Sequence, residues 1–137
     1  MINILFVCTG NSCRSQMAEG LGKELADGRF AVKSAGVSPI GVHPMSIKTM
    51  AEIGIDISEQ TSKMLDPEMI KWAEYVITLC NSARDNCPVI PGNVKKLHWD
   101  IENPDRLYLS ETARDKAFAR TRDEIKERIE DLFDNIE

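Results

Sequence analysis

Two pairs of cysteines, Cys8 with Cys13 and Cys80 with Cys87, are the side chains of this sequence most suited to chemistry. Cys8 opens the stretch CTGNSCRS, in which Arg14 follows six positions later. Four cysteines could form disulfides, bind a metal, pack in a core or react as thiolates. The spacings contain no Cys-x-x-Cys and the chain has only two histidines, so we expect no metal site. Reactive thiols are the main alternative to packing.

The stretch CTGNSCRS predicts a loop that binds a tetrahedral oxyanion. Its small residues leave room for backbone N–H groups to converge, and the helix predicted after it adds the positive end of a dipole. Arg14 can bind two oxygens of the same anion. We expect phosphate or a phosphate-like anion to bind here. The predicted binding residues are Thr9, Gly10, Asn11, Ser12, Cys13, Arg14 and Ser15.

The same features act on Cys8. Convergent amides, a helix N-terminus and Arg14 all favour a thiolate over a thiol, and the Ser15 hydroxyl could add a hydrogen bond to the sulfur. We expect Cys8 to be a nucleophile, the alternative being that it fills space at the end of a strand. For Cys13, which lies early in the helix, we expect packing instead.

The second pair of cysteines lies in the segment LCNSARDNCP. NSARDN lacks the apolar face of a packed helix, so we expect a short, exposed helical turn. Movement there would let Cys80 and Cys87 pass between separate and disulfide-bonded states. Such movement would be necessary, because a disulfide needs Cα atoms within roughly 7 Å. The alternative is two unrelated cysteines in one loop.

Apolar runs and helical patterns alternate along the chain, which predicts an α/β fold. We expect a single domain over 1–137, with a four-stranded parallel sheet, helices on both faces and an oxyanion-binding loop after the first strand. Ligands bind at the carboxyl ends of strands in such sheets, and Cys8 and Cys80 both follow predicted strands. The expected strands are 2–7, 29–34, 75–79 and 94–99. Helices are expected from the end of the first loop to Gly28, from Pro44 to Gly54, from Asp66 to about Trp72, and from about Ser110 onward.

Composition limits the partners. The net charge of −5 over 137 residues argues against nucleic acid, which needs clustered Lys and Arg. No apolar run approaches the roughly 20 residues of a membrane span, and residues 2–7 are too short for a signal peptide. We therefore expect a cytoplasmic protein and a monomer, with thiols in a reducing compartment.

Six motifs together resemble the thioredoxin-coupled arsenate reductases, a group that shares its fold with the low-molecular-weight protein tyrosine phosphatases. The resemblance extends from Met1 to the last helix, and the second cysteine pair favours the reductases over the phosphatases. The motifs are CTGNSCRSQMAEG at 8–20, SAG at 34–36, GIDIS at 54–58, QTS at 60–62, TLC at 78–80 and NCP at 86–88.

The resemblance implies reduction of arsenate to arsenite. Cys8 would attack arsenic, Cys80 would attack Cys8, and Cys87 would attack Cys80, leaving a disulfide for thioredoxin. It implies arsenate as substrate, phosphate as a competing anion, thioredoxin as external reductant and no bound cofactor. Two alternatives use the same loop: a tyrosine phosphatase relying on Cys8 and Arg14, and a non-catalytic oxyanion sensor.

The chain departs from the family pattern after its last strand. The family commonly has Asp-Pro in this loop, where the aspartate transfers a proton. This chain has Asn103 before Pro104, and an asparagine cannot act as an acid. The resemblance therefore implies that the role is absent or has moved to Glu102 or Asp105.

A second departure concerns a potassium ion that some of these reductases hold beside the loop. Asn11, Glu19 and Ser34 match its ligand positions, but Lys63 stands where a carboxylate is expected. We expect no potassium, and a Lys63 ammonium could take its place. Four further residues are expected to have structural roles only: His43, His98, Trp72 and Trp99.

Overall fold

The computed structural model describes residues 1–86, 91–106 and 108–136. Four parallel strands form one sheet in the order β2-β1-β3-β4, which confirms the predicted α/β class. The strands are β1 (Ile2–Cys8), β2 (Phe30–Gly36), β3 (Tyr75–Thr78) and β4 (Lys95–His98). The helices are α1 (Arg14–Leu25), α2 (Pro44–Ala51), α3 (Pro67–Trp72), α4 (Asn81–Asn86) and α5 (Glu111–Asn135).

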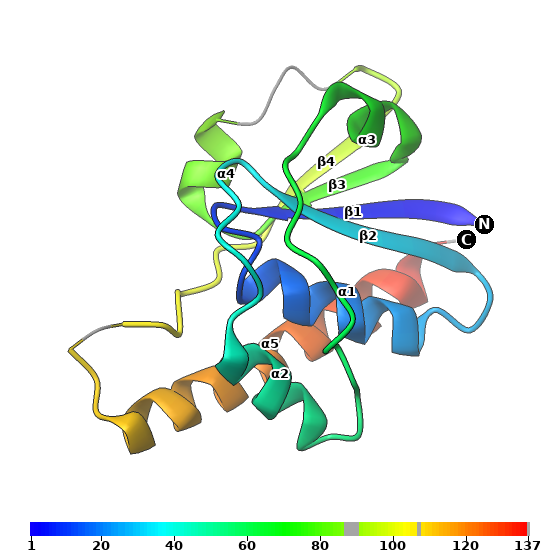
Figure 1. The fold of residues 1–137 in the computed structure, drawn as a ribbon. Coiled ribbons are helices and arrows are strands. Elements are labelled where there is room, and N and C mark those ends of the chain that lie inside the picture. The colour runs from blue at the N-terminus through cyan, green and yellow to red at the C-terminus, as the bar shows by residue number, and fades with distance from the viewer. Residues whose placement is uncertain (87–90, 107, 137) are drawn as a thin grey trace.

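The central strands β1 and β3 account for the two apolar runs of the sequence. Residues 4–8 of β1 and 76–78 of β3 are buried, as strands covered on both faces should be. Figure 1 shows α1 and α5 side by side below the sheet and α3 on its other face. This arrangement leaves the carboxyl edge of the sheet open to a ligand.

Helix starts follow the capping signals in the sequence. The Asp66 carboxylate accepts the N–H of Met69 at 2.8 Å ahead of α3, and the Ser110 hydroxyl accepts that of Ala113 at 3.1 Å ahead of α5. Pro44 is the first residue of α2, where its missing N–H costs nothing. Local chemistry therefore sets where these helices begin.

Several boundaries differ from the prediction by one to three residues, and two of them have a clear physical reason. β2 runs to Gly36, two residues beyond its expected end, because it pairs with β1 as far as Cys8 opposite Gly36. α2 ends at Ala51, and the chain then turns through Gly54, whose φ is +79°. The extension of β2 brings Gly36 against the loop that follows Cys8.

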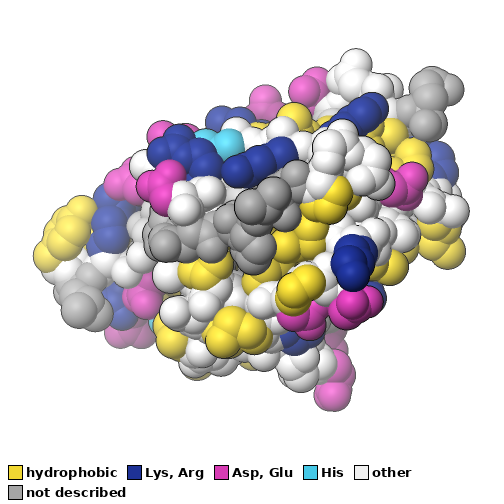
Figure 2. All heavy atoms as spheres, turned by 90° about the horizontal axis from the view of Figure 1, so that it is seen from above, with side chains coloured by type: hydrophobic (Ala, Val, Ile, Leu, Met, Phe, Trp, Pro, Cys, Tyr) yellow, Lys and Arg dark blue, Asp and Glu magenta, His cyan; other side chains and the backbone are white. Residues whose placement is uncertain are grey.

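The surface carries charges of both signs. On the face drawn in Figure 2, basic and acidic side chains are interspersed, with hydrophobic side chains between them. Within the described part of the chain, no helix is both long enough and apolar enough to cross a membrane.

Candidate active site

The Cys8 loop, defined as residues 9–13, joins the end of β1 to the start of α1. It lies at the carboxyl edge of the sheet, together with the segment after β2 and the start of α4 (Figure 1). Cys8 is the last residue of β1 and Arg14 the first of α1. The parallel sheet therefore places Cys8 and Arg14 at opposite ends of one short loop, as the sequence predicts.

The carbonyl oxygens and the backbone amides of the Cys8 loop differ in their hydrogen bonding. Among the residues that the structure describes, no backbone N–H of residues 9–14 donates to a protein acceptor. The carbonyl oxygens, in contrast, each accept at least one hydrogen bond. A row of unengaged amides at a helix N-terminus is a binding site for an anion. The carbonyl partners are Ser38 for Thr9, Ile40 and Ser62 for Gly10, Gln16 for Asn11, His43 and Ser46 for Ser12, and Met17 for Cys13.

Asn11 fixes the shape of the loop from inside. It is fully buried and has a φ of +46°, a conformation that asparagine tolerates better than most residues. Its amide group donates to the hydroxyls of Ser15 at 2.7 Å and Ser34 at 2.9 Å, and its oxygen accepts the N–H of Lys63 at 2.8 Å. One side chain thus ties the loop to α1, β2 and the segment before α3.

Gly36 allows β2 to approach the loop closely. A Cβ at this position would lie 2.7 Å from the Thr9 carbonyl oxygen and 2.8 Å from the Asn11 nitrogen. Both are backbone atoms, so neither could move aside cheaply. Glycine is therefore required here by space.

Among the described residues, one polar side chain lies within hydrogen-bond distance of the Cys8 sulfur. The sulfur lies 2.9 Å from the Ser15 hydroxyl, and Cys8 is buried. Because Ser15 accepts the hydrogen bond from Asn11, its own proton is available to the Cys8 sulfur. A hydroxyl aimed in this way stabilises a thiolate.

Cys13 differs from Cys8 although the two lie in one short segment. It is buried at the N-cap of α1, and burial raises the pKa of its thiol from about 9 to about 11. The thiol is therefore protonated at neutral pH. Its surroundings suit a packed side chain rather than a nucleophile.

A cavity of about 300 Å³ opens above Cys8 and Arg14. One guanidinium nitrogen of Arg14 donates to the Ile101 carbonyl at 2.9 Å, which holds the arginine against the loop after β4. That loop also brings Asn103 to the cavity wall. The lining residues are Cys8, Thr9, Gly10, Ser12, Cys13, Arg14, Ser38, Ile40, Asn103 and Asp105.

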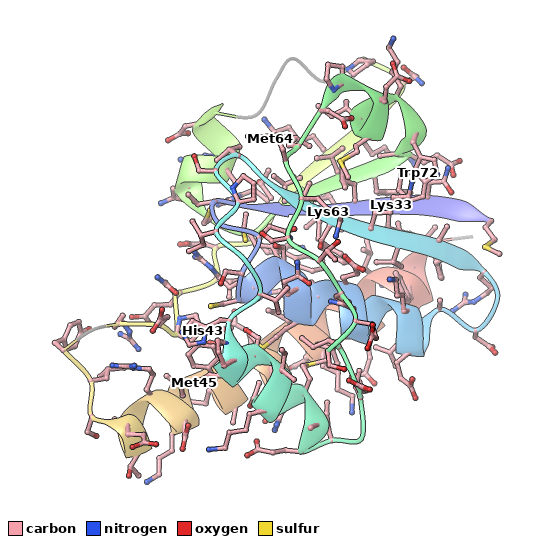
Figure 3. The ribbon with its side chains drawn as sticks, viewed as in Figure 1. Lys33, His43, Met45, Lys63, Met64 and Trp72 are labelled. Carbon is pink, nitrogen blue, oxygen red and sulfur yellow. The ribbon has the colours of Figure 1, made fainter. Side chains whose placement is uncertain are left out.

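The two carboxylates considered as substitutes for an acid at Asn103 lie in different places. Glu102 is paired with Arg106 and its side chain is 75% exposed, outside the cavity. Asp105 lines the cavity and lies 3.3 Å from Nε2 of His43. Figure 3 shows His43 at the start of α2, facing the loop that carries Asp105.

Cys80 lies beside the Cys8 loop, two residues beyond the end of β3. Its sulfur is 3.1 Å from the Thr9 hydroxyl and accepts the N–H of Ala83 at 3.4 Å. It is buried, and α4 follows directly as the expected short helix, with Arg84 and Asp85 exposed. Cys87 lies outside the described residues.

Glu19 meets cations from the protein itself. Its carboxylate is buried, accepts the Ser34 hydroxyl, and lies 2.6 Å from Nζ of Lys23 and 3.5 Å from Nζ of Lys63. Figure 3 shows Lys63 on the strand-like segment that crosses in front of β2. These residues do not fit a potassium ion, because an ammonium already faces the carboxylate. In the described ranges, no three His, Cys, Asp or Glu side chains form a metal site.

The remaining predicted structural residues make structural contacts. His98 bridges the Thr78 hydroxyl at 2.8 Å and the Asn81 side chain at 3.2 Å, which joins β3, β4 and α4. Trp99 packs on Phe6 with ring centroids 5.8 Å apart. Trp72 is partly buried and packs against the core, and its ring also lies under the Lys33 ammonium, 4.4 Å from the ring centroid (Figure 3).

Sequence reasoning missed three residues at or beside the cavity. Ser38 and Ile40 follow β2 in the chain. Because β2 lies next to β1 in the sheet, the segment after β2 lies beside the Cys8 loop, and this adjacency could have placed both residues at the cavity. His43 was expected to have only a structural role. It does cap α2, but its second nitrogen faces Asp105, a contact between segments that no local pattern reveals.

The sequence of this chain is similar to a known protein family and to individual relatives. The model of the low molecular weight phosphotyrosine protein phosphatase family matches residues 3–137. Arsenate reductase 2 of Staphylococcus saprophyticus is 48% identical over 132 residues, or 96% of each chain.

Solved structures of arsenate reductases are similar to this chain in fold. An arsenate reductase in its phosphate binding state has a TM-score of 0.81 and 38% identity over the whole of both chains. The thioredoxin-dependent arsenate reductase of Corynebacterium glutamicum has a TM-score of 0.79 and 31% identity, over 98% of this chain and 61% of its own. The predicted fold is confirmed.

Proposed function

The chain belongs to the low molecular weight phosphotyrosine protein phosphatase family, in which its close relatives are arsenate reductases, and from this premise we propose that it reduces arsenate to arsenite. We propose further that three cysteines carry the electrons and that thioredoxin restores them. The observation that carries the proposal is the Cys80 sulfur held 3.1 Å from Thr9, beside the anion-binding loop. A phosphatase has no use for a second thiol there.

The first step is substitution at arsenic. The unengaged amides of the Cys8 loop and the guanidinium of Arg14 bind the oxyanion, as they would bind phosphate. The Cys8 thiolate forms a sulfur–arsenic bond, and one oxygen of arsenate leaves as water after protonation. Arsenic is still pentavalent at this stage.

The second step transfers the electrons. The Cys80 thiolate attacks the Cys8 sulfur, the sulfur–arsenic bond breaks, and its electron pair stays on arsenic. Two thiolates have then become one disulfide, and pentavalent arsenic has become trivalent arsenite. Cys80 needs only a local movement to reach Cys8, because it already contacts the adjacent residue, Thr9.

The third step regenerates Cys8. Cys87 attacks Cys80, which frees Cys8 and leaves a Cys80–Cys87 disulfide for thioredoxin to reduce. The six-residue helix α4 lies between these two cysteines in the sequence. The cycle needs a compartment that keeps thiols reduced, which is the condition of the cytoplasm.

The test is arsenate-dependent oxidation of NADPH in the presence of thioredoxin and its reductase, run beside hydrolysis of an aryl phosphate. Turnover with arsenate and little aryl phosphate hydrolysis is the expected result. Cys87→Ser should accumulate a Cys8–Cys80 disulfide after one turnover, detected by peptide mapping without reduction. Turnover by Cys80→Ser at the normal rate would contradict the relay.

A phosphatase is the second candidate, because Asp105 brings a carboxylate to the cavity. Fast aryl phosphate hydrolysis without reduction of arsenate would favour it. Neither activity, with phosphate still protecting Cys8 from alkylation, would favour a sensor that binds phosphate without turnover.

We also propose that Lys63, with Lys23, neutralises Glu19 in place of a potassium ion. The buried Glu19 connects through Ser34 and Asn11 to Ser15 beside Cys8, so its neutralisation supports the loop. Unfolding in urea should be equal in potassium chloride and tetramethylammonium chloride. Lys63→Asp should become more stable in potassium, whereas Lys63→Met should not. A wild-type protein stabilised by potassium would contradict this proposal.

A further inference from the structure

Asp105 is the one carboxylate among the described residues that line the cavity above Cys8. The other groups of the lining include many that can donate a hydrogen bond: the loop amides, Arg14, the Asn103 amide group, and the hydroxyls of Thr9, Ser12 and Ser38. A carboxylate in an anion site is costly, because it repels any fully ionised ligand. Its presence calls for a ligand that offers a proton.

The orientation of Asp105 is set by its neighbours. His43 Nδ1 accepts the N–H of Met45 at 3.0 Å, so the neutral ring carries its proton on Nε2, 3.3 Å from the Asp105 carboxylate. Arg114 Nε lies 3.9 Å from the other carboxylate oxygen. The Asp105 backbone N–H donates to the Asn103 side chain at 3.0 Å, which fixes the turn. These contacts hold an acceptor against the cavity wall.

We propose that Asp105 makes this site selective for oxyanions that carry a proton, arsenate and phosphate, over sulfate. At neutral pH arsenate and phosphate keep at least one O–H group, whereas sulfate has none. The Asp105 carboxylate accepts a charge-assisted hydrogen bond from that O–H group. Sulfate has the same shape and offers only lone pairs, so it meets repulsion at the same point.

The other donors of the site do not discriminate in this way. Amides and a guanidinium bind any tetrahedral anion, and the Cys8 loop alone would admit sulfate as readily as phosphate. Asp105 is therefore a specificity-determining residue, and His43 a positioning residue for it. The inference rests on the proposed function only in naming arsenate as the reacting oxyanion.

The test measures binding without turnover. Alkylation of Cys8 by iodoacetamide, followed by peptide mapping at pH 7.5 and constant ionic strength, gives protection constants for phosphate and for sulfate. We expect phosphate to protect at least ~10-fold better in the wild-type protein. In Asp105→Asn, sulfate should protect Cys8 better, because an amide can donate as well as accept. The ratio of phosphate protection to sulfate protection should therefore fall by about tenfold.

Glu102→Gln is the matched control, because it removes the same charge from the same loop outside the cavity. It should leave the ratio unchanged. His43→Gln should lower the ratio by less than Asp105→Asn, since it releases the carboxylate without removing it. An unchanged ratio in Asp105→Asn, or an equal fall in Glu102→Gln, would overturn the proposal. An inactive reductase with this selectivity intact would instead overturn the proposed function alone.

Discussion

A cysteine lies at the carboxyl end of β1 and another lies two residues beyond the end of β3, but the two have different surroundings. Cys8 closes β1 and is followed by a loop whose carbonyls are all bonded. Cys80 follows β3 and is succeeded by a six-residue helix in which Asn81, Arg84 and Asp85 are exposed and Ala83 is buried. The Cys8 loop is hydrogen-bonded to several segments of the chain. In the described part of the Cys80 segment, the hydrogen bonds to other elements are those of Cys80 with Thr9 and of Asn81 with His98.

This difference matches two kinds of chemistry. Binding an anion requires donors that are already in place, because reorganising them costs free energy during the reaction. Thiol–disulfide exchange requires that one sulfur approach several others in turn. A thiol beside a fully hydrogen-bonded loop at one strand end, and a thiol that opens a short helix beyond the next, suit these two requirements within one sheet. The variants below would break or sharpen this contrast.

The largest effect should come from replacing the two cysteines separately. Cys8→Ser should abolish reduction of arsenate and hydrolysis of aryl phosphate, each by ~10³-fold or more, since both need the nucleophile. Cys80→Ser should abolish sustained reduction of arsenate but leave aryl phosphate hydrolysis and the protection of Cys8 by phosphate intact. Steady-state assays and alkylation measure these. Loss of phosphate protection in Cys80→Ser would show that the two regions are not separable.

Gly36 tests the rigidity of the Cys8 loop. Gly36→Ala should lower the free energy of unfolding by about 1–3 kcal/mol, because its Cβ would meet backbone atoms of Thr9 and Asn11. Phosphate protection of Cys8 should weaken about tenfold as the loop shifts. Urea unfolding and alkylation are the measurements.

Gly92→Ala is the control, from the connection between α4 and β4. Among the described residues, a Cβ added to Gly92 would have no heavy atom within 4 Å beyond its chain neighbours, so stability should change by less than about 0.5 kcal/mol. Equal effects of the two substitutions would remove the contrast between the regions.

The sequence predicted best what depends on neighbouring residues. Apolar runs located β1 and β3, and a parallel sheet then placed Cys8 and Cys80 at one edge, because strands of one direction end together. Asp66 and Ser110 predicted helix starts, since a cap bonds two or three residues away.

What the sequence could not show are contacts between distant segments. The His43–Asp105 contact depends on how the loop after β4 crosses the start of α2. The reach of β2 to Gly36 depends on its pairing with β1. Each follows from tertiary packing, which local spacing does not encode.

Asn103 tests the loop that covers the Cys8 region. Asn103→Asp should raise aryl phosphate hydrolysis about tenfold or more, because a positioned acid protonates the leaving group. Reduction of arsenate should change much less, since its oxygens exchange protons with water. Comparing kcat for aryl phosphates with basic and acidic leaving groups measures the effect. An unchanged rate would mean that Asn103 does not face the leaving group.

The smallest effect concerns Cys13, the packed thiol of the rigid region. Burial raises the pKa of Cys13 to about 11, against about 9 for a free thiol. Because the folded state holds this proton more tightly, its contribution to stability is complete below pH 9 and is lost as the pH rises through 11. Between pH 8.5 and 10 the free energy of unfolding should therefore fall by about 1 kcal/mol more in the wild-type protein than in Cys13→Ala. Urea unfolding at several pH values measures the slopes, with Ser12→Ala as a control that removes a neighbouring group that does not titrate. Parallel slopes for wild type and Cys13→Ala would mean that this thiol reaches water, and that the Cys8 region is less tightly packed than the contrast with Cys80 requires.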